Sequence, residues 1–217
     1  MKFFFENAKK AKLSATNTVP TAKKVSIVVK TLAHDVATSA EFCGVTRRIT
    51  HLLGMYGTIA FWVSSAILIF SSSSASSVWP VIWHVGAIMT CIGGYWFWFI
   101  QRVDVRSEGN AWSRIVFADL FVMSLVLTST FALLWSFFQS SNSIGLAMLF
   151  FIMFVISNVV LFGGVYWSKF AHMFYKPGAA IQKHLAKADG SRDDLPEPAD
   201  LPKQYGLGIK RSEPQNY

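Results

Sequence analysis

Residues 115–138 read IVFADLFVMSLVLTSTFALLWSFF, an almost unbroken apolar run whose one charged residue is Asp119. The run is longer than the roughly 20 residues that an α-helix needs to cross the hydrocarbon core of a bilayer. Comparable runs cover residues 51–70, 79–100 and 144–170. The sequence therefore predicts an all-α integral membrane protein whose transmembrane domain is a bundle of four helices.

The distribution of charge predicts how the four spans cross the membrane. Residues 71–78 and 139–143, which connect the spans on one side, contain no Lys, Arg, Asp or Glu. All 20 Lys and Arg residues precede residue 50, lie in the loop 101–114 or follow residue 168. Because cytoplasmic loops accumulate Lys and Arg, we expect a multi-pass protein of the cell membrane with both termini in the cytoplasm.

Three regions follow from this pattern. Residues 1–48 form a basic cytoplasmic segment. Within it, residues 25–45 have the apolar spacing of a membrane-surface helix. The apolar run at the start of the chain is too short for a signal peptide. Residues 49–176 form the four-helix domain. Residues 177–217 form a cytoplasmic tail rich in Pro and Asp, with a short helix at 179–188. The net charge of +8 flanks the spans, which indicates anionic lipid headgroups rather than nucleic acid as the partner.

Histidines at span ends are candidates for cofactor binding, because a polar group at membrane depth is costly and often functional. His51 opens the first span and His172 closes the fourth, both on the predicted cytoplasmic side, whereas His84 opens the second span on the other side. A b-type haem takes two axial imidazoles that face each other. His51 and His172 are the only pair that this topology allows, so they are the candidate ligands of the haem iron.

Residues near the two histidines have types that suit a haem. Gly54 and Gly57 follow His51 closely and would let a porphyrin face approach the helix, while Arg48 and Lys169 are cations that could meet its propionates. The pattern also has a simpler interpretation: a histidine near the headgroups can be an interfacial polar residue, and membrane glycines often serve helix packing. The cysteines lack the spacing of an iron–sulfur site.

Asp119 is the one acidic residue within a predicted span, about a turn and a half from its start. A carboxylate at this depth should pair with a cation, and Arg48 or Lys169 from neighbouring spans are the expected partners. Two interpretations follow. Asp119 either forms a structural ion pair between helices or accepts a proton beside a quinone headgroup.

The stretch WSKFAHMFYKP at residues 167–177 resembles the end of the last membrane helix in a family of cytochrome b-type subunits. This family includes the gamma subunit of respiratory nitrate reductase and the membrane subunits of heterodisulfide-reductase-type complexes, which interact with quinones. The resemblance implies that His172 is a haem ligand and that His51, in the RRITH entry at residues 47–51, is its partner. Asn158 stands in span four where dihaem members have a further histidine, so the resemblance supports one haem at most.

Two functions are therefore expected. The first is a membrane subunit of a redox complex that passes electrons between quinone and a cytoplasmic partner, at most the electron-transfer subunit of an oxidoreductase. The second is a non-catalytic accessory or assembly subunit of a larger membrane enzyme. The tail from residue 189 is similar to small membrane proteins of ammonia-oxidising archaea, so an archaeal ammonia monooxygenase or a respiratory complex would be such an enzyme.

Overall fold

The computed structural model describes residues 15–40, 42, 44–71, 76–102, 108–166 and 171–191. Within these ranges every regular element is helical, as predicted. Four helical segments are long and apolar enough to cross a membrane, which makes the chain a multi-pass membrane protein. They are α3 (Val45–Phe70), α4 (Val78–Trp96) with the π-turn η2 (Phe97–Gln101), the 3-10 turn η3 (Phe117–Asp119) with α6 (Leu120–Ser140), and α7 (Ile144–Gly163).

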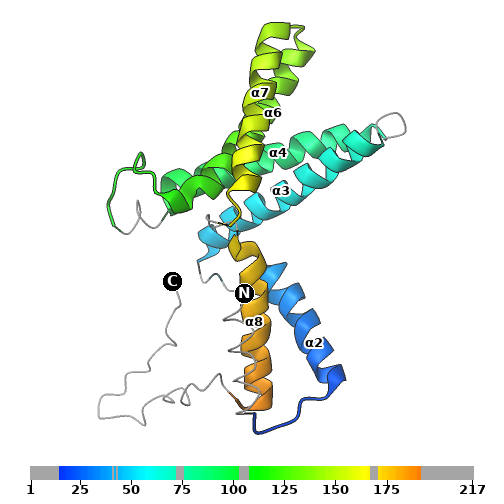
Figure 1. Ribbon diagram of the computed structural model, residues 1–217, viewed down its shortest axis with the longest axis vertical. Helices are drawn as coiled ribbons and strands as arrows, with labels where there is room; N and C mark the ends of the chain where they lie inside the picture. The colour runs from blue at the N-terminus through cyan, green and yellow to red at the C-terminus, as the bar shows by residue number, and fades with distance from the viewer. Residues whose placement is uncertain are drawn as a thin grey trace. The chain divides into compact units, whose positions relative to one another are not determined.

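The spans are arranged as two antiparallel hairpins, α3 with α4 and α6 with α7 (Figure 1). Helices α4 and α6 join the hairpins. His84 of α4 lies 2.8 Å from the Ser136 hydroxyl of α6, and Tyr95 lies 2.9 Å from the Thr130 hydroxyl. These contacts occur in opposite order along the two helices, so α4 and α6 are antiparallel neighbours over much of their length.

Glycines let α3 and α4 approach each other closely. A Cβ atom placed on Gly86 would lie 2.6 Å from the Phe61 backbone nitrogen, and one on Gly93 would lie 2.7 Å from the Gly54 nitrogen. Both distances are too short for any side chain, so only glycine permits this contact. Close backbone packing of this kind is a main source of helix association in membranes, where no hydrophobic force draws helices together.

Aromatic side chains form the core between the two hairpins. Phe61 of α3 is 2% exposed. Its ring centroid lies 5.2 Å from that of Trp83 in α4 and 6.4 Å from that of Phe154 in α7. Ala87 and Ala132 complete the buried cluster. The α3–α7 contact therefore adds a second connection between the hairpins.

The observed span ends differ from the predicted ones on the charged side. Helix α3 begins at Val45 rather than at residue 51, so Arg48 lies within it. Helix α7 ends at Gly163, followed by a turn through residue 166, instead of continuing to residue 170. The pair Gly163–Gly164 accounts for this end, because glycine is the weakest helix former after proline. Consequently His172 opens another helix, α8 (His172–Asp189), and the prediction that it closes span four was wrong.

The chain divides into two compact units, Gly44–His172 and a second unit made from both flanking segments. In the second unit α2 (Thr21–Thr31) and the π-turn η1 (Leu32–Val36) line a cavity together with α8, and Asp35 of η1 accepts a hydrogen bond from His184 of α8. The helix predicted at residues 25–45 thus ends at residue 36, and the one predicted at 179–188 extends back through Pro177 to His172. The rest of the predicted tail, from residue 192 on, lies outside the described residues.

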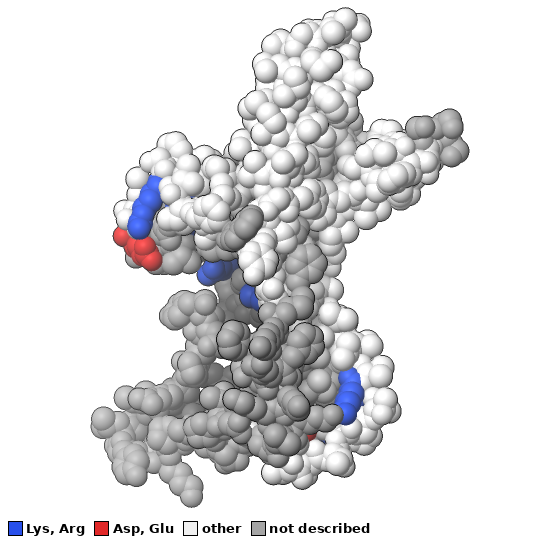
Figure 2. Space-filling model, in the orientation of Figure 1, with Lys and Arg blue, Asp and Glu red and all other residues white. Residues whose placement is uncertain are grey.

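The spans carry few charges on their visible surface. On the face shown in Figure 2, the described parts of α3, α4, α6 and α7 show no Lys, Arg, Asp or Glu over most of their length. Charged side chains gather where α4 ends and α6 begins. We call the level of the α4 end and the α6 start the charged end of the spans, and the level of the α4 start and the turn 141–143 the hairpin end.

Candidate functional site

A buried ion pair lies at the charged end of the spans. Arg102 directly follows η2, and Asp119 closes η3 just before α6. The Arg102 Nη2 atom lies 3.2 Å from the Asp119 Oδ2 atom, and the two side chains are only 3% and 4% exposed. Removing both charges from water is costly, so such a pair persists only where further hydrogen bonds hold it.

Backbone groups and an aromatic ring supply those contacts. The Arg102 guanidinium donates to the Trp112 carbonyl at 3.4 Å and also to the Arg114 carbonyl, and it lies 4.6 Å from the centre of the Trp98 ring. The Asp119 carboxylate accepts the Val116 N–H at 3.2 Å. Arg102 therefore connects the end of α4, the loop before α6 and the first turn of α6.

This geometry corrects the predicted surroundings of Asp119. Among the described residues its cationic partner is Arg102, so the predicted partner Arg48 was wrong. The carboxylate lies in the first turn of the span rather than a turn and a half inside it. Lys169 itself lies outside the described residues. Arg102 was missed although the sequence holds a signal for it: it is the first cation after the aromatic end of span two, on the same side as Asp119.

The candidate haem ligands occupy the same end of the unit. His51 lies half-buried near the start of α3. His172 is half-buried, and its ring packs edge-on against Phe121 of α6, with 6.0 Å between ring centroids. Phe121 is two residues beyond Asp119, so His172 lies at the level of the ion pair but on a different side of the helix. Within the described residues, no group of three or more His, Cys, Asp or Glu side chains could hold a metal ion.

The two glycines that follow His51 have different surroundings. Gly57 is packed against α4, because a Cβ atom there would lie 2.7 Å from the Thr90 nitrogen, so this glycine serves helix packing. At Gly54 a Cβ atom would meet no atom within 4 Å. The side of Gly54 that a side chain would occupy, one turn from His51, is therefore open, whereas the same side of Gly57 is filled by α4.

His84 has a structural role. One ring nitrogen, Nδ1, lies 2.7 Å from the Pro80 carbonyl oxygen, and the other, Nε2, lies 2.8 Å from the Ser136 hydroxyl. Both nitrogens are therefore engaged by protein atoms, and the ring joins α4 to α6 near the hairpin end. This arrangement makes His84 a suitable control residue for experiments on His51 and His172.

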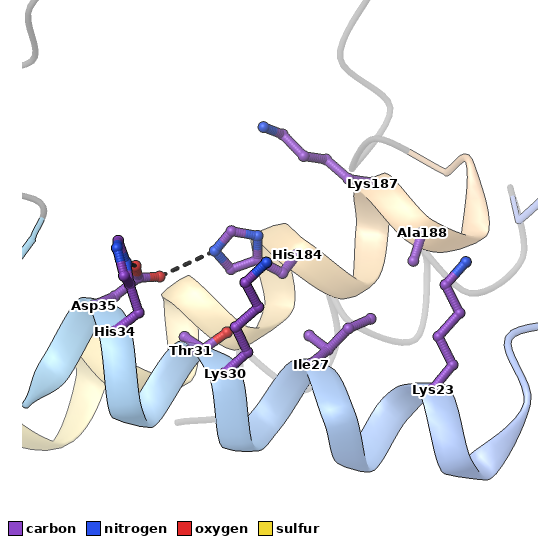
Figure 3. A pocket seen from close by; sticks show the side chains of 9 residues that line it. All are labelled: Lys23, Ile27, Lys30, Thr31, His34, Asp35, His184, Lys187 and Ala188. Atoms are coloured by element: carbon purple, nitrogen blue, oxygen red, sulfur yellow. Dashed lines mark hydrogen bonds and ion pairs between the residues drawn. The ribbon is translucent and has the colours of Figure 1, made fainter.

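Two cavities in the described parts of the chain lie away from His51, Asp119 and His172. One, of about 390 Å³, lies between α6 and α7 at the hairpin end and includes Trp135, Gln139 and Met148. The other, of about 520 Å³, lies between α2 and α8 and has charged side chains in its lining (Figure 3).

Comparison with protein-family models, curated proteins and solved structures gives no match to this chain.

Proposed function

We propose that the chain is the membrane subunit of a redox complex, similar to cytochrome b-type quinone-interacting subunits. The observation that carries this proposal is the gathering of His172, Phe121 and the Arg102–Asp119 pair at the charged end of the spans, where α3 also presents His51. Ionisable and aromatic groups concentrated at one membrane depth are typical of redox and proton-handling sites.

His51 and His172 are the proposed axial ligands, and Arg48 and Lys169 the proposed cations for the propionates. Haem b, when bound, supplies one-electron transfer. Gly54 leaves room beside His51 for the ring. Asp119, held by Arg102, fixes the first turn of α6, against which His172 packs. A quinone headgroup beside this turn would be the proposed electron donor or acceptor.

The proposed orientation places this end of the spans in the cytoplasm of the cell, together with both termini. The uncharged connections at the hairpin end support it, as does the clustering of all Lys and Arg on the other side. A soluble or peripheral redox partner would then dock on the cytoplasmic side.

A reduced-minus-oxidised optical spectrum of the detergent-solubilised protein tests the haem. We expect a b-type band that His172→Ala and His51→Ala each abolish and that His84→Ala, the matched control, leaves unchanged. Gly54→Leu should lower haem content without loss of folded protein, because its side chain would enter open space. A folded, haem-reconstituted sample without the band, or equal losses in His84→Ala, would contradict the proposal.

A second function is that of an accessory subunit without a redox centre. It is favoured by the enclosure of the ion pair and by the large exposed apolar surface of α7. The Arg102 Nη1 and Nη2 atoms and the Asp119 Oδ2 atom are engaged within the chain. In α7 only 11% of an apolar stretch of 18 residues is buried inside the chain, whereas the buried share of such a stretch in the span Phe117–Ser140 is 33%. Helix α7 thus presents an apolar face to lipid or to another membrane subunit. Absence of the haem band together with a discrete larger assembly in native membranes would select this function.

A further inference from the structure

The cavity of about 520 Å³ between α2 and α8 is lined by basic side chains from both helices (Figure 3). Lys23 and Lys30 lie on one face of α2, two turns apart, with Ile27 between them. Lys187 reaches the cavity from α8. Within the described part of the chain, none of the three ammonium groups forms a hydrogen bond or an ion pair. Three like charges around one cavity repel each other unless an anion joins them.

The one acidic group of the cavity is already engaged. The two carboxylate oxygens of Asp35 accept hydrogen bonds from His34 Nδ1 at 2.9 Å and from His184 Nε2 at 3.0 Å. The His34 contact, together with His184, lowers the pKa of the Asp35 carboxyl below its usual value, against the opposing effect of burial. Asp35 therefore stays ionised and holds the two imidazoles, and the three lysines are left to attract a ligand of opposite charge.

We propose that this cavity binds a phosphate group. A phosphate monoester carries up to two negative charges and three acceptor oxygens, which suits a cavity lined by lysines from two helices. Lysine binds phosphate as a compact point charge with three donors, and its flexible stem can follow the ligand. The group can belong to an anionic lipid such as phosphatidic acid or to a soluble phosphate ester. This proposal is independent of the proposed redox role.

The chain offers a matched control for testing this site. Lys24 on α2 and Lys183 on α8 are exposed lysines on the same helices, and neither lines the cavity. The double variant Lys30→Gln/Lys187→Gln removes two charges from the cavity, whereas Lys24→Gln/Lys183→Gln removes two charges from the same helices outside it. Both variants change the net charge equally and keep side chains of similar length.

Two measurements on the full-length protein distinguish the sources of the phosphate. Calorimetric titration of the detergent-solubilised protein with inorganic phosphate reports a soluble ligand. Native mass spectrometry after reconstitution in nanodiscs reports retained lipid, with phosphatidic acid compared against phosphatidylcholine. We expect the cavity variant to weaken binding by about tenfold in one or both measurements, since charge-assisted contacts are lost. The control variant should change it by less than about twofold.

Each outcome decides the proposal. A loss confined to the cavity variant in titration identifies a soluble phosphate ester, and a loss confined to retained phosphatidic acid identifies a lipid headgroup. Equal losses in both double variants would show that binding follows net charge alone and would overturn the proposal. It would also be overturned if wild-type protein neither bound millimolar phosphate nor retained phosphatidic acid over phosphatidylcholine.

Discussion

Among single residues, Arg102 and Asp119 form a buried ion pair in the membrane unit. Their side chains are almost fully enclosed, so neither charge can turn to water if its partner is removed. Breaking a buried pair by removing one partner is strongly destabilising, whereas replacing both charges with apolar side chains is often neutral or favourable. The pair is therefore a test of whether this end of the spans is held together by electrostatics or by packing.

We expect Arg102→Leu to lower the free energy of unfolding by roughly 3–5 kcal/mol, because Asp119 is left as an unpaired buried charge. The double variant Arg102→Leu/Asp119→Leu should recover most of that loss. The exposed pair Arg114–Glu108, with an N–O distance of 4.0 Å and exposed fractions of 54% and 55%, provides the control. Glu108→Gln should change stability little. Denaturation in detergent micelles measures the free energy of unfolding of the wild type and the three variants. If the double variant were no more stable than Arg102→Leu, the loss in Arg102→Leu would not come from the unpaired charge of Asp119.

Asp119→Asn separates the two roles that the sequence left open for this carboxylate. The ion pair with Arg102 favours the structural role. We then expect the variant to assemble less well while quinol-driven haem reduction, measured per assembled molecule, stays as in wild type. A variant that assembles normally, holds haem and loses reduction would instead identify Asp119 as a proton acceptor.

Asp35 predicts a pH dependence outside the membrane unit. Its pKa is lowered, first by the His34 hydrogen bond and also by His184, so its ionised form is stabilised in the folded state. The contribution is present at neutral pH and is lost as pH falls below about 4, through the lowered pKa. Amide exchange of α8, corrected for intrinsic rates, should show protection that falls in this range. In the Asp35→Asn variant, the protection of α8 should be lower at neutral pH and should no longer fall below about pH 4. If the variant kept the wild-type dependence of protection on pH, Asp35 would not stabilise α8.

At the scale of helices, the α3–α4 hairpin depends on glycines in contact with backbone. Gly93→Ala would bring its Cβ to 2.7 Å from the Gly54 nitrogen, so the two helices must separate. Overpacking of this kind costs roughly 1–3 kcal/mol. In α7, a Cβ atom on Gly145 would meet nothing within 4 Å, so Gly145→Ala should be neutral or slightly stabilising. Thermal denaturation in micelles compares them, and equal effects of the two substitutions would contradict the packing account.

The sequence predicted the four spans because length and continuous hydropathy decide membrane helices, and the structure has four helices with these properties. The predicted helix bounds were wrong where the local helix propensity and the tertiary contacts favour different ends. Pro177 indicated a helix break, yet α8 continues through it, at the cost of the one hydrogen bond that its missing N–H would donate to Met173. Conversely, the apolar run of span four indicated a longer helix than the glycines at residues 163–164 permit.

The candidate site was only partly predictable for a related reason. The side of the membrane on which each charge lies can be inferred from the order of spans, but the partner of Asp119 depends on how helices pack sideways. That packing places α6 beside α4, which brings Arg102 to Asp119. Likewise, Asp35 and His184 are separated by the whole membrane unit in sequence, and only the pairing of α2 with α8 brings them together.

At the scale of the whole chain, the apolar and the basic residues belong largely to two different units. Gly44–His172 holds the apolar helices, and the flanking segments join into a separate unit with a basic cavity. Basic residues that the sequence related to lipid headgroups in general thus become a defined cavity between two helices. The side of the membrane that this unit faces determines which phosphate compounds and which redox partners could reach it.

Cysteine labelling tests the proposed topology on which these assignments rest. After replacement of Cys43 and Cys91, single cysteines are introduced at Ser76 and Ser141, both exposed near the hairpin end, and at Ser113, exposed in the loop before α6. We expect a membrane-impermeant maleimide added to intact cells to label the first two positions, and to label Ser113→Cys only after permeabilisation. The physical reason is that loops rich in Lys and Arg remain in the cytoplasm, whereas uncharged hairpins cross readily. The reverse pattern would place His51, Asp119 and His172 outside the cell, and a cytoplasmic redox partner could not then reach them.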